Sequence, residues 1–487
     1  MSSVLTRVES LLFSPIPRRA RSARAGLIVV GALLAASLVA VAGPVLALAI
    51  VVVLAGAVLV LRDLRWGFVV LFAVIGLLPF ATLPFKLGFT PTFLDLALLA
   101  LYFVWVVRIA RREQHELIGS VLGIPVLIFL LLAIFAFVVG IQYALPTSTT
   151  TRNFVELVLG ILAFFLVLNS LGRQADIELV ACLIMLAGAM GATIAIVLYF
   201  VPQDWTIRVF DSLSRFNYPG GAGALRYIND DPSQAMRAIG TQIDPNVLGG
   251  FLILMAGFTA PQLVSARPLV PRAWVAFFLA AEALALYLTH SRGSLVGLAA
   301  AISVLGALRY RRLLLLELLA LVALILLPQA QAYVAHFIAG IQLQDQATQM
   351  RLGEYKDALT LIMRYPWFGV GFAGSPDASL YIGVSSVYLL MAEEMGIIGV
   401  ICYLVIVAGF FGSLWHAWRR CRADIRVDKA ARREALLLGT GTGILAVMVG
   451  GLFDHYLFNL VYPHMSTLFW IFLGLGMAAT LPRSATN

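Results

Sequence analysis

Six arginines could together bind a phosphate-bearing ligand. They are Arg208, Arg215, Arg226 and Arg237 within residues 202–245, Arg292 in the motif THSRGS, and Arg351 at the start of a later polar stretch. A guanidinium group is permanently charged, and its planar fork matches phosphate oxygens, so a convergent set would suit a membrane-bound diphosphate. The arginines of residues 202–245 could instead pair with acids of the same segment. Arg292 has no acidic residue near it in the sequence and lies between apolar runs, so we expect it to be functional.

A reaction also needs a group that accepts a proton or orients a hydroxyl. The candidates in these regions are His290, His336, His455, Asp244, Asp377 and Asp454. We expect His455, in GGLFDHYLF, to be catalytic, with a polar anchor at the membrane surface as the alternative. Glu393 lies inside an apolar run, where a carboxylate is costly unless it is paired. We therefore expect it either at the site or paired with an arginine.

The composition places these residues in a membrane protein. The 487 residues are 61% hydrophobic and 12% charged, with a mean hydropathy of +0.95. This excludes a set of soluble domains and predicts an all-α polytopic membrane protein of about 14 transmembrane helices, 12 to 14 allowing for short and long runs. The net charge of +9 is scattered between apolar runs, which favours contact with membrane lipids over nucleic acid. Three cysteines indicate neither a disulfide framework nor a zinc site.

The positive charges also predict the orientation. With a cytoplasmic N-terminus, 24 of the 34 Lys and Arg residues fall in inside segments, so both termini are expected to be cytoplasmic. The expected organisation is a cytoplasmic interfacial segment at 1–25, a transmembrane bundle at 26–201, a first long periplasmic loop at 202–245, transmembrane helices at 246–328, a second long periplasmic loop at 329–385, and C-terminal transmembrane helices at 386–487. Within the second loop, the spacing of apolar residues over 345–365 predicts a helix that ends at Pro366.

Four sequence blocks occur in an order and spacing that resemble the bacterial O-antigen ligase and polymerase superfamily. They are RAIGTQIDPNVLGGFLIL at 237–254, LTHSRGSLVGL at 288–298, RLGEYKDALTLIMRYPWFGVGF at 351–372, and SSVYLLMAEEMGIIGV at 385–400. The resemblance implies a membrane glycosyltransferase with a GT-C-type fold. Its donor would be a glycan on a polyprenyl diphosphate, normally undecaprenyl, and its acceptor a lipid or another glycan on the outer side of the inner membrane. It implies no cofactor, since the leaving group is already a diphosphate.

The resemblance also implies roles for individual residues. Arg292 and Arg351 match the arginines that would contact the diphosphate. Arg237 and Asn246 match a basic residue followed by G-x-x-x-x-P-N, where Asp244 equally fits the cap of a helix that begins at Pro245.

The chain departs from the pattern of the ligases before Tyr388. Ligases usually carry a His-Asn or similar pair there, whereas this chain has Ser385 and Ser386. A serine without a partner is no general base at neutral pH. A polymerase is therefore favoured slightly over a ligase. The expected substrate-binding residues are Arg215, Arg237, Asp244, Asn246, Ser385, Ser386 and Tyr388.

Two other functions fit a chain with many spans. A flippase for lipid-linked oligosaccharides is the main alternative, although carriers tend to place polar groups along a central path and to show two related halves. A non-catalytic partner in envelope assembly is the other.

Overall fold

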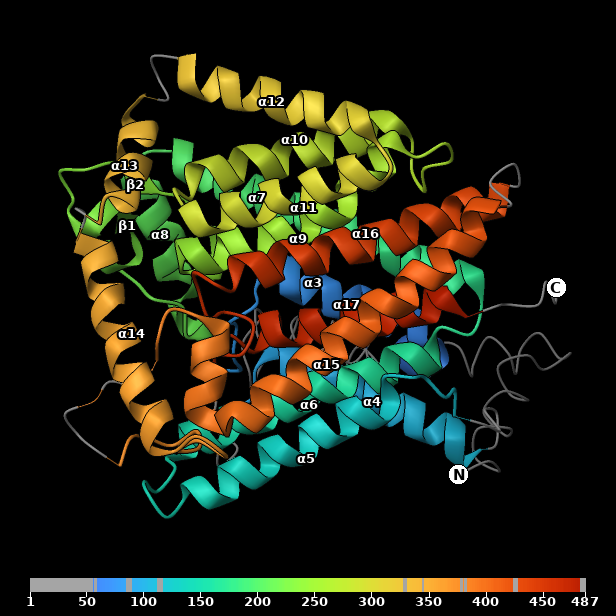
Figure 1. Ribbon diagram of the computed structural model, residues 1–487, viewed down its shortest axis with the longest axis horizontal. Helices are drawn as coiled ribbons and strands as arrows, with labels where there is room; N and C mark the ends of the chain where they lie inside the picture. The colour runs from blue at the N-terminus through green and yellow to red at the C-terminus, as the bar shows by residue number, and fades with distance from the viewer. Residues whose placement is uncertain are drawn as a thin grey trace, which may run out of the picture. The chain divides into compact units, whose positions relative to one another are not determined.

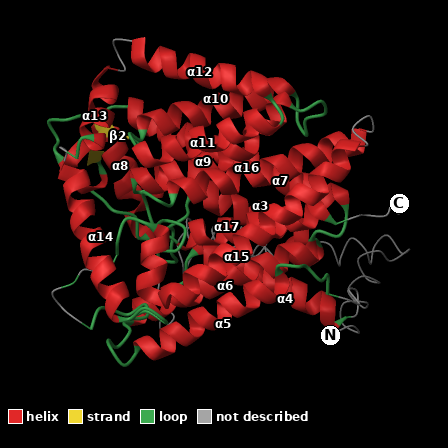
Figure 2. Ribbon diagram, viewed as in Figure 1, coloured by secondary structure: helices red, strands yellow, loops and turns green. Residues whose placement is uncertain are grey.

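The computed structural model describes residue 56 and residues 59–84, 90–111, 117–326, 331–343, 346–376, 380, 383–423 and 428–481. The chain divides into two units, Met1–Trp66 and Gly67–Asn487. The expected segment at 1–25 and the expected span at 26–43 lie outside the described residues, as does Asp377. The architecture is therefore that of the second unit, which is helical apart from one pair of two-residue strands among its described residues (Figure 1, Figure 2).

The α-helices are α3 (Leu64–Leu77), α4 (Phe93–Ala110), α5 (Gly123–Gly140), α6 (Ser148–Ser170), α7 (Gln174–Phe200), α8 (Gln203–Leu213), α9 (Pro245–Val264), α10 (Arg272–Leu288), α11 (Arg292–Leu308), α12 (Arg311–Leu326), α13 (Gln331–Ile341), α14 (Gln346–Arg364), α15 (Val387–Ala423), α16 (Asp428–Gly450) and α17 (Pro463–Thr480). Short 3-10 helices occur at η1 (Ser214–Phe216), η2 (Ala222–Ala224), η3 (Ile228–Asp230) and η4 (Gly240–Gln242). The strands are β1 (Arg226–Tyr227) and β2 (Met236–Arg237), which pair antiparallel.

Seven of the helices in the described part are long and apolar enough to cross a membrane. They are α4, α5, α6, α7, α9, α15 and α16. The prediction of an all-α polytopic membrane protein is confirmed at this level.

Two helices form the centre of the second unit because their sequences are apolar or small on every side. Helix α9 has no single hydrophobic face, and nearly all of its residues are buried. The same holds for α17, which packs along α6. The start of α9 follows from its first residues. The side chain of Asp244 accepts hydrogen bonds from the N–H groups of Asn246 at 2.7 Å and Val247 at 3.1 Å, and Pro245 occupies the first helical position.

Glycines allow α9, α11 and α16 to approach closely. A Cβ on Gly257 of α9 would lie 2.8 Å from the Cα of Gly443 on α16. A Cβ on Gly297 of α11 would lie 3.0 Å from the backbone N of Gly450, also on α16. Small residues permit this close packing in membrane helices. As a result, the N-termini of α9 and α11 and the C-terminus of α16 meet at one end of the helices.

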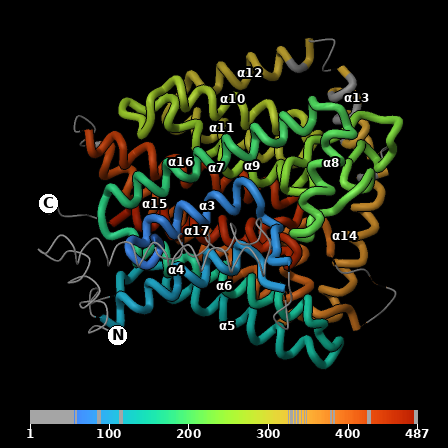
Figure 3. Tube along the Cα trace, turned by 180° about the vertical axis from the view of Figure 1, so that it is seen from behind, coloured from blue at the N-terminus to red at the C-terminus, as the bar shows by residue number. Residues whose placement is uncertain are grey.

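The segments between the spans cover that same end. Figure 1 and Figure 3 show α14 running across the ends of the longer helices, close to α8 and the β1–β2 hairpin. The predicted helix at 345–365 is confirmed as α14, which ends at Arg364, two residues before Pro366.

Candidate functional site

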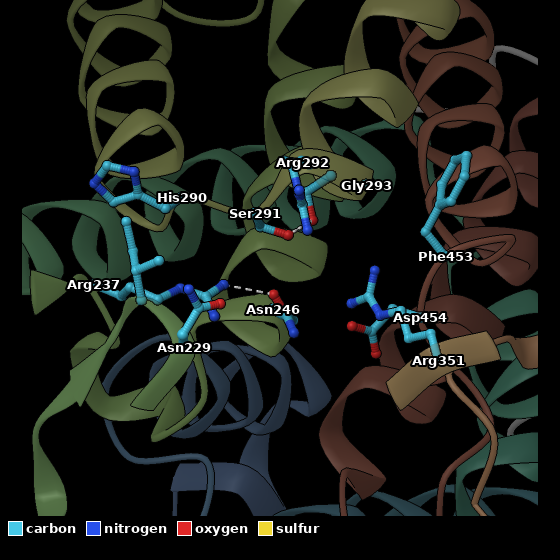
Figure 4. Close-up of a pocket in the computed structure, with 12 residues that line it drawn as sticks. Asn229, Arg237, Asn246, His290, Ser291, Arg292, Gly293, Arg351, Phe453 and Asp454 are labelled. Atoms are coloured by element: carbon cyan, nitrogen blue, oxygen red, sulfur yellow. Dashed lines mark hydrogen bonds between the residues drawn. The ribbon is translucent and has the colours of Figure 1, made fainter. Parts of the chain in front are cut away.

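A pocket lies where the ends of α9, α11 and α16 meet beneath α14 (Figure 4). Its empty volume is about 560 Å³, including the space at its open mouth. It is lined by Ile228, Asn229, Arg237, Asn246, His290, Ser291, Arg292, Gly293, Ser294, Arg351, Phe453 and Asp454. We call this the arginine pocket, because three arginines from distant parts of the chain face it.

Arg237 is the last residue of strand β2, and two hydrogen bonds fix its guanidinium. Its Nε donates to the carbonyl of Thr289 at 2.8 Å, and its Nη2 donates to Oδ1 of Asn246 at 2.7 Å. Asn246 is in the first turn of α9, so the pair joins the hairpin to the start of that helix (Figure 4). Asp244 acts as the helix cap and does not line the pocket.

Arg292 is the first residue of α11, and its side chain extends beneath α13. A Cβ on Gly340 of α13 would overlap the Arg292 guanidinium, so this glycine makes room for it. Nη2 of Arg292 also lies 3.5 Å from Oγ1 of Thr348 at the start of α14. Among the described residues no side chain caps the first turn of α11. The N–H groups of this first turn therefore add positive potential to the pocket, whereas those of α9 are capped by Asp244.

Arg351 reaches the pocket from α14. Its side chain is partly buried, yet it makes no hydrogen bond or ion pair with any residue that the structure describes. The nearest group of opposite charge is Asp454, which lies just after α16 and interacts with Arg351 electrostatically. Burial raises the pKa of the Asp454 carboxyl, while the charges of His455 and Arg351 oppose that rise.

The charge of the arginine pocket is unbalanced. Asp454 is the one acid among its twelve lining residues, against three arginines and the N-terminus of α11. Arginine side chains that face the same pocket repel each other unless an anion binds between them. The arrangement is suited to a doubly or triply charged phosphate group.

Ser385, Ser386 and Tyr388 lie beside the arginine pocket without lining it. The N–H of Ser385 donates to the Glu354 carboxylate on α14 at 3.0 Å. The hydroxyl of Ser386 is 3.5 Å from the carbonyl of Gly451, and that of Tyr388 donates to the carbonyl of Met448 at 2.7 Å. These bonds tie the start of α15 to α14 and to the end of α16.

Glu393 contributes through its backbone. Its carbonyl accepts a hydrogen bond from the N–H of Val370 at 2.7 Å, and the N–H of Gly371 donates to the carbonyl of Glu394 at 3.0 Å. This docks the PWFGVG segment after α14 onto α15, where the helix is broken at Gly396. The Glu393 side chain is buried. It does not line the pocket.

Glycines make this docking possible. Gly369, Gly371 and Gly396 have φ values of 67°, 78° and 71°, which disfavour other residues. A Cβ on Gly396 would overlap the backbone of Trp367. We call residues 366–371 together with Glu393–Gly396 the backbone lock, because it fixes the C-terminal end of α14.

His455 and Arg215 also lie outside the pocket lining. The His455 ring stacks on Tyr462, with ring centroids 6.4 Å apart at 24°, whereas its neighbour Asp454 faces the pocket. Arg215 is exposed, and its Nε donates to the carbonyl of Ser212 at 3.1 Å. Asn229, Ser291 and Phe453 line the pocket although the sequence did not single them out. Ser291 directly precedes the arginine of the SRG motif, which was the one available signal.

A family model described as O-Antigen ligase matches residues 274–404. The resemblance to the O-antigen ligase and polymerase superfamily is confirmed. The match includes Arg292 and Arg351, while Arg237 and Asp454 lie outside it and rest on the geometry of the pocket. Together with the apolar helices, this match supports a membrane enzyme of the O-antigen ligase or polymerase type in polysaccharide biosynthesis. No curated protein matches the chain significantly.

Proposed function

We propose that this protein is a glycosyltransferase that moves a glycan from a polyprenyl diphosphate to a lipid or glycan acceptor, on the outer side of the bacterial inner membrane. The observation that carries the proposal is the convergence of Arg237, Arg292 and Arg351 on one pocket at two helix N-termini. The proposal includes 12 to 14 spans of the GT-C type, with both termini in the cytoplasm.

In the proposed reaction, an acceptor hydroxyl oxygen attacks the anomeric carbon of the glycan. The bond from that carbon to the phosphate oxygen breaks, and its electron pair leaves with the lipid diphosphate. Arg292 and Arg351 would neutralise the charge that develops on the leaving oxygen. Guanidinium groups held in a shielded pocket stabilise such charge with little reorganisation.

The proton of the acceptor hydroxyl needs a base, and Asp454 is the best-placed group. It is the carboxylate of the arginine pocket, and its raised pKa makes it a stronger base than an exposed aspartate. His455 and Glu393 are less well supported, because neither lines the pocket. The proposed role of His455 is to position Asp454, and that of Glu393 is to position the backbone lock.

We favour a polymerase over a ligase. Ser385 stands where ligases usually carry the histidine, so this position supplies no imidazole. The backbone N–H of Ser385 donates a hydrogen bond to Glu354. An acceptor hydroxyl activated by Asp454 would belong to a sugar at the end of a second lipid-linked chain. Ser386, Tyr388 and Arg215 would then act outside the reaction centre.

The alternative is a flippase for lipid-linked oligosaccharides. A carrier would need polar groups along its transmembrane path. The central helices α9 and α17 are instead packed with buried, mostly apolar side chains, and the three arginines gather at one end.

The experiment uses purified protein, a defined lipid-linked glycan and product analysis. Arg292→Ala should abolish glycan transfer while insertion and expression stay normal. Undiminished transfer in this variant would overturn the proposal. Translocation of the lipid in vesicles, with no glycan product from the unaltered protein, would identify a flippase.

A further inference from the structure

A second, smaller pocket adjoins the arginine pocket and shares Arg237 with it. It is lined by Ala195, Leu198, Tyr199, Thr206, Leu225, Arg226, Met236, Arg237, Ala238 and Ile239. It is a shallow depression, and its empty volume of about 230 Å³ includes space that is open to solvent. We call it the side groove.

Two arginines oppose each other at the edge of the side groove. Arg226 of β1 is the direct cross-strand partner of Arg237 in β2. Directly opposed residues of an antiparallel pair point to the same face, and like charges in this position are destabilising. Both side chains do line the groove. A two-residue hairpin has few other contacts to offset that repulsion.

No acid within the described part of the chain relieves this repulsion at Arg226. Arg226 is partly buried and makes no hydrogen bond or ion pair with a described residue. The acids at the tip of the hairpin are exposed, and Asp231 accepts the N–H of Ser233 at 2.9 Å instead. Arg237 donates hydrogen bonds to Thr289 and Asn246. Arg226 is therefore placed to bind an anion that the described residues do not supply.

The rest of the side groove is apolar and begins at the end of a membrane span. Ala195, Leu198 and Tyr199 belong to the last turns of α7, one of the helices long enough to cross the bilayer. Leu225 and Ile239, which are buried, are further apolar residues of its lining. A charged edge beside an apolar wall suits a ligand that is a phosphate at one end and a hydrocarbon at the other.

We infer that the side groove binds the junction between the lipid chain and the diphosphate of the donor. The phosphate nearest the lipid lies between Arg226 and Arg237, and the first isoprenoid units lie against the end of α7. The second phosphate then reaches Arg292 and Arg351 in the arginine pocket. This inference rests on the proposed function, and it adds Arg226 and the side groove to the donor site.

The test measures binding of two probes to the full-length protein in detergent. The probes are inorganic pyrophosphate and farnesyl diphosphate, which has the same head with three isoprenoid units. Farnesyl diphosphate should bind more tightly than pyrophosphate. Arg226→Ala should weaken both by about tenfold or more, because a hydrogen-bonded charge contact is lost. Leu198→Asn should weaken farnesyl diphosphate only.

Two control variants keep the same kinds of change outside the pockets. Lys356→Ala removes an exposed cation of α14 that lines neither pocket, and it should change nothing. Val197→Asn introduces the same polar group next to Leu198 at a position exposed outside the groove, and it should leave both affinities unchanged.

The outcomes separate the two proposals. If Arg292→Ala leaves pyrophosphate binding intact, the proposed function fails. If Arg292→Ala weakens binding but Arg226→Ala does not, or if the farnesyl chain adds no affinity, the inference about the side groove alone fails. It also fails if dioctanoyl phosphatidylglycerol displaces farnesyl diphosphate at equal concentration, since the groove would then hold an ordinary phospholipid headgroup.

Discussion

Replacing Arg351 gives the sharpest test of the arginine pocket. This side chain makes no hydrogen bond within the described part of the protein, so Arg351→Ala breaks no internal contact of that kind. The unfolding free energy should stay within about 0.5 kcal/mol of the unaltered value, as for a surface substitution. Arg292→Ala is less clean, because it leaves a void beneath Gly340 and removes the contact with Thr348.

The expected effect on the reaction is large. A unit charge about 4 Å from a developing oxyanion contributes about 4 kcal/mol at the effective dielectric constant of a protein surface. Removing one such donor from comparable sites slows turnover by about 100- to 1,000-fold. Arg351→Ala should therefore reduce glycan transfer by that factor. Arg351→Lys should retain part of the activity, since it keeps the charge but loses the planar fork.

The assay follows product formation from a purified lipid-linked donor and thermal unfolding of the same preparations. Lys356→Ala serves as the matched control, because that exposed cation lies on the same helix and outside the pocket. Normal turnover by a stable Arg351→Ala protein would refute the reasoning. A general loss of thermal stability would show that Arg351 has a structural role.

Two further predictions concern the carboxylate and the backbone lock. Because burial raises the pKa of Asp454, the rate of glycan transfer should decline as the pH falls through that raised pKa. Asp454→Asn should lose most of the activity, and its remaining rate should not show this decline. A carboxyl group whose pKa is raised in the folded state stabilises the fold at low pH and loses that contribution as the pH rises. Asp454→Asn should therefore unfold at a higher temperature than the unaltered protein above neutral pH. Equal melting temperatures across the pH range would contradict this. Gly396→Ala should destabilise the protein by about 2 kcal/mol or more, because the φ of Gly396 is positive and the added Cβ would overlap Trp367. Gly353→Ala is the control, because open space surrounds the added Cβ, and it should be neutral or slightly stabilising. Equal melting temperatures of the two variants would contradict the role of the backbone lock.

The sequence predicted the convergence of arginines better than it predicted their neighbours. Arg292 and Arg351 could be chosen because positive charge is scarce in those segments and because motif blocks surround them. The α14 helix could be predicted from its apolar spacing and from Pro366 after its end. Each of these signals is local in the sequence.

The remaining features depend on contacts that no local pattern shows. Asp454 faces the pocket and His455 does not, a difference set by how the chain leaves α16 after its close contact with α11. Arg226 looks like any other loop arginine until the strand register sets it opposite Arg237. Glu393 attracted attention as a buried acid, yet its clearest contact is made by its carbonyl with Val370. This contact is a hydrogen bond between backbone groups, so the identity of the side chain does not predict it.

The backbone lock and the arginine pocket are connected through α14. Arg351 stands near the start of α14, while the other end of that helix is fixed by backbone hydrogen bonds between residues 366–371 and the break in α15. The start of α15 is tied in turn to α14 by the bond from Ser385 to Glu354. An arginine that has no internal hydrogen bond of its own in the described structure can face an anion only if its helix is held from elsewhere. Close backbone packing through glycine provides that support without placing any further charge in the pocket, so the positive potential remains available to the ligand.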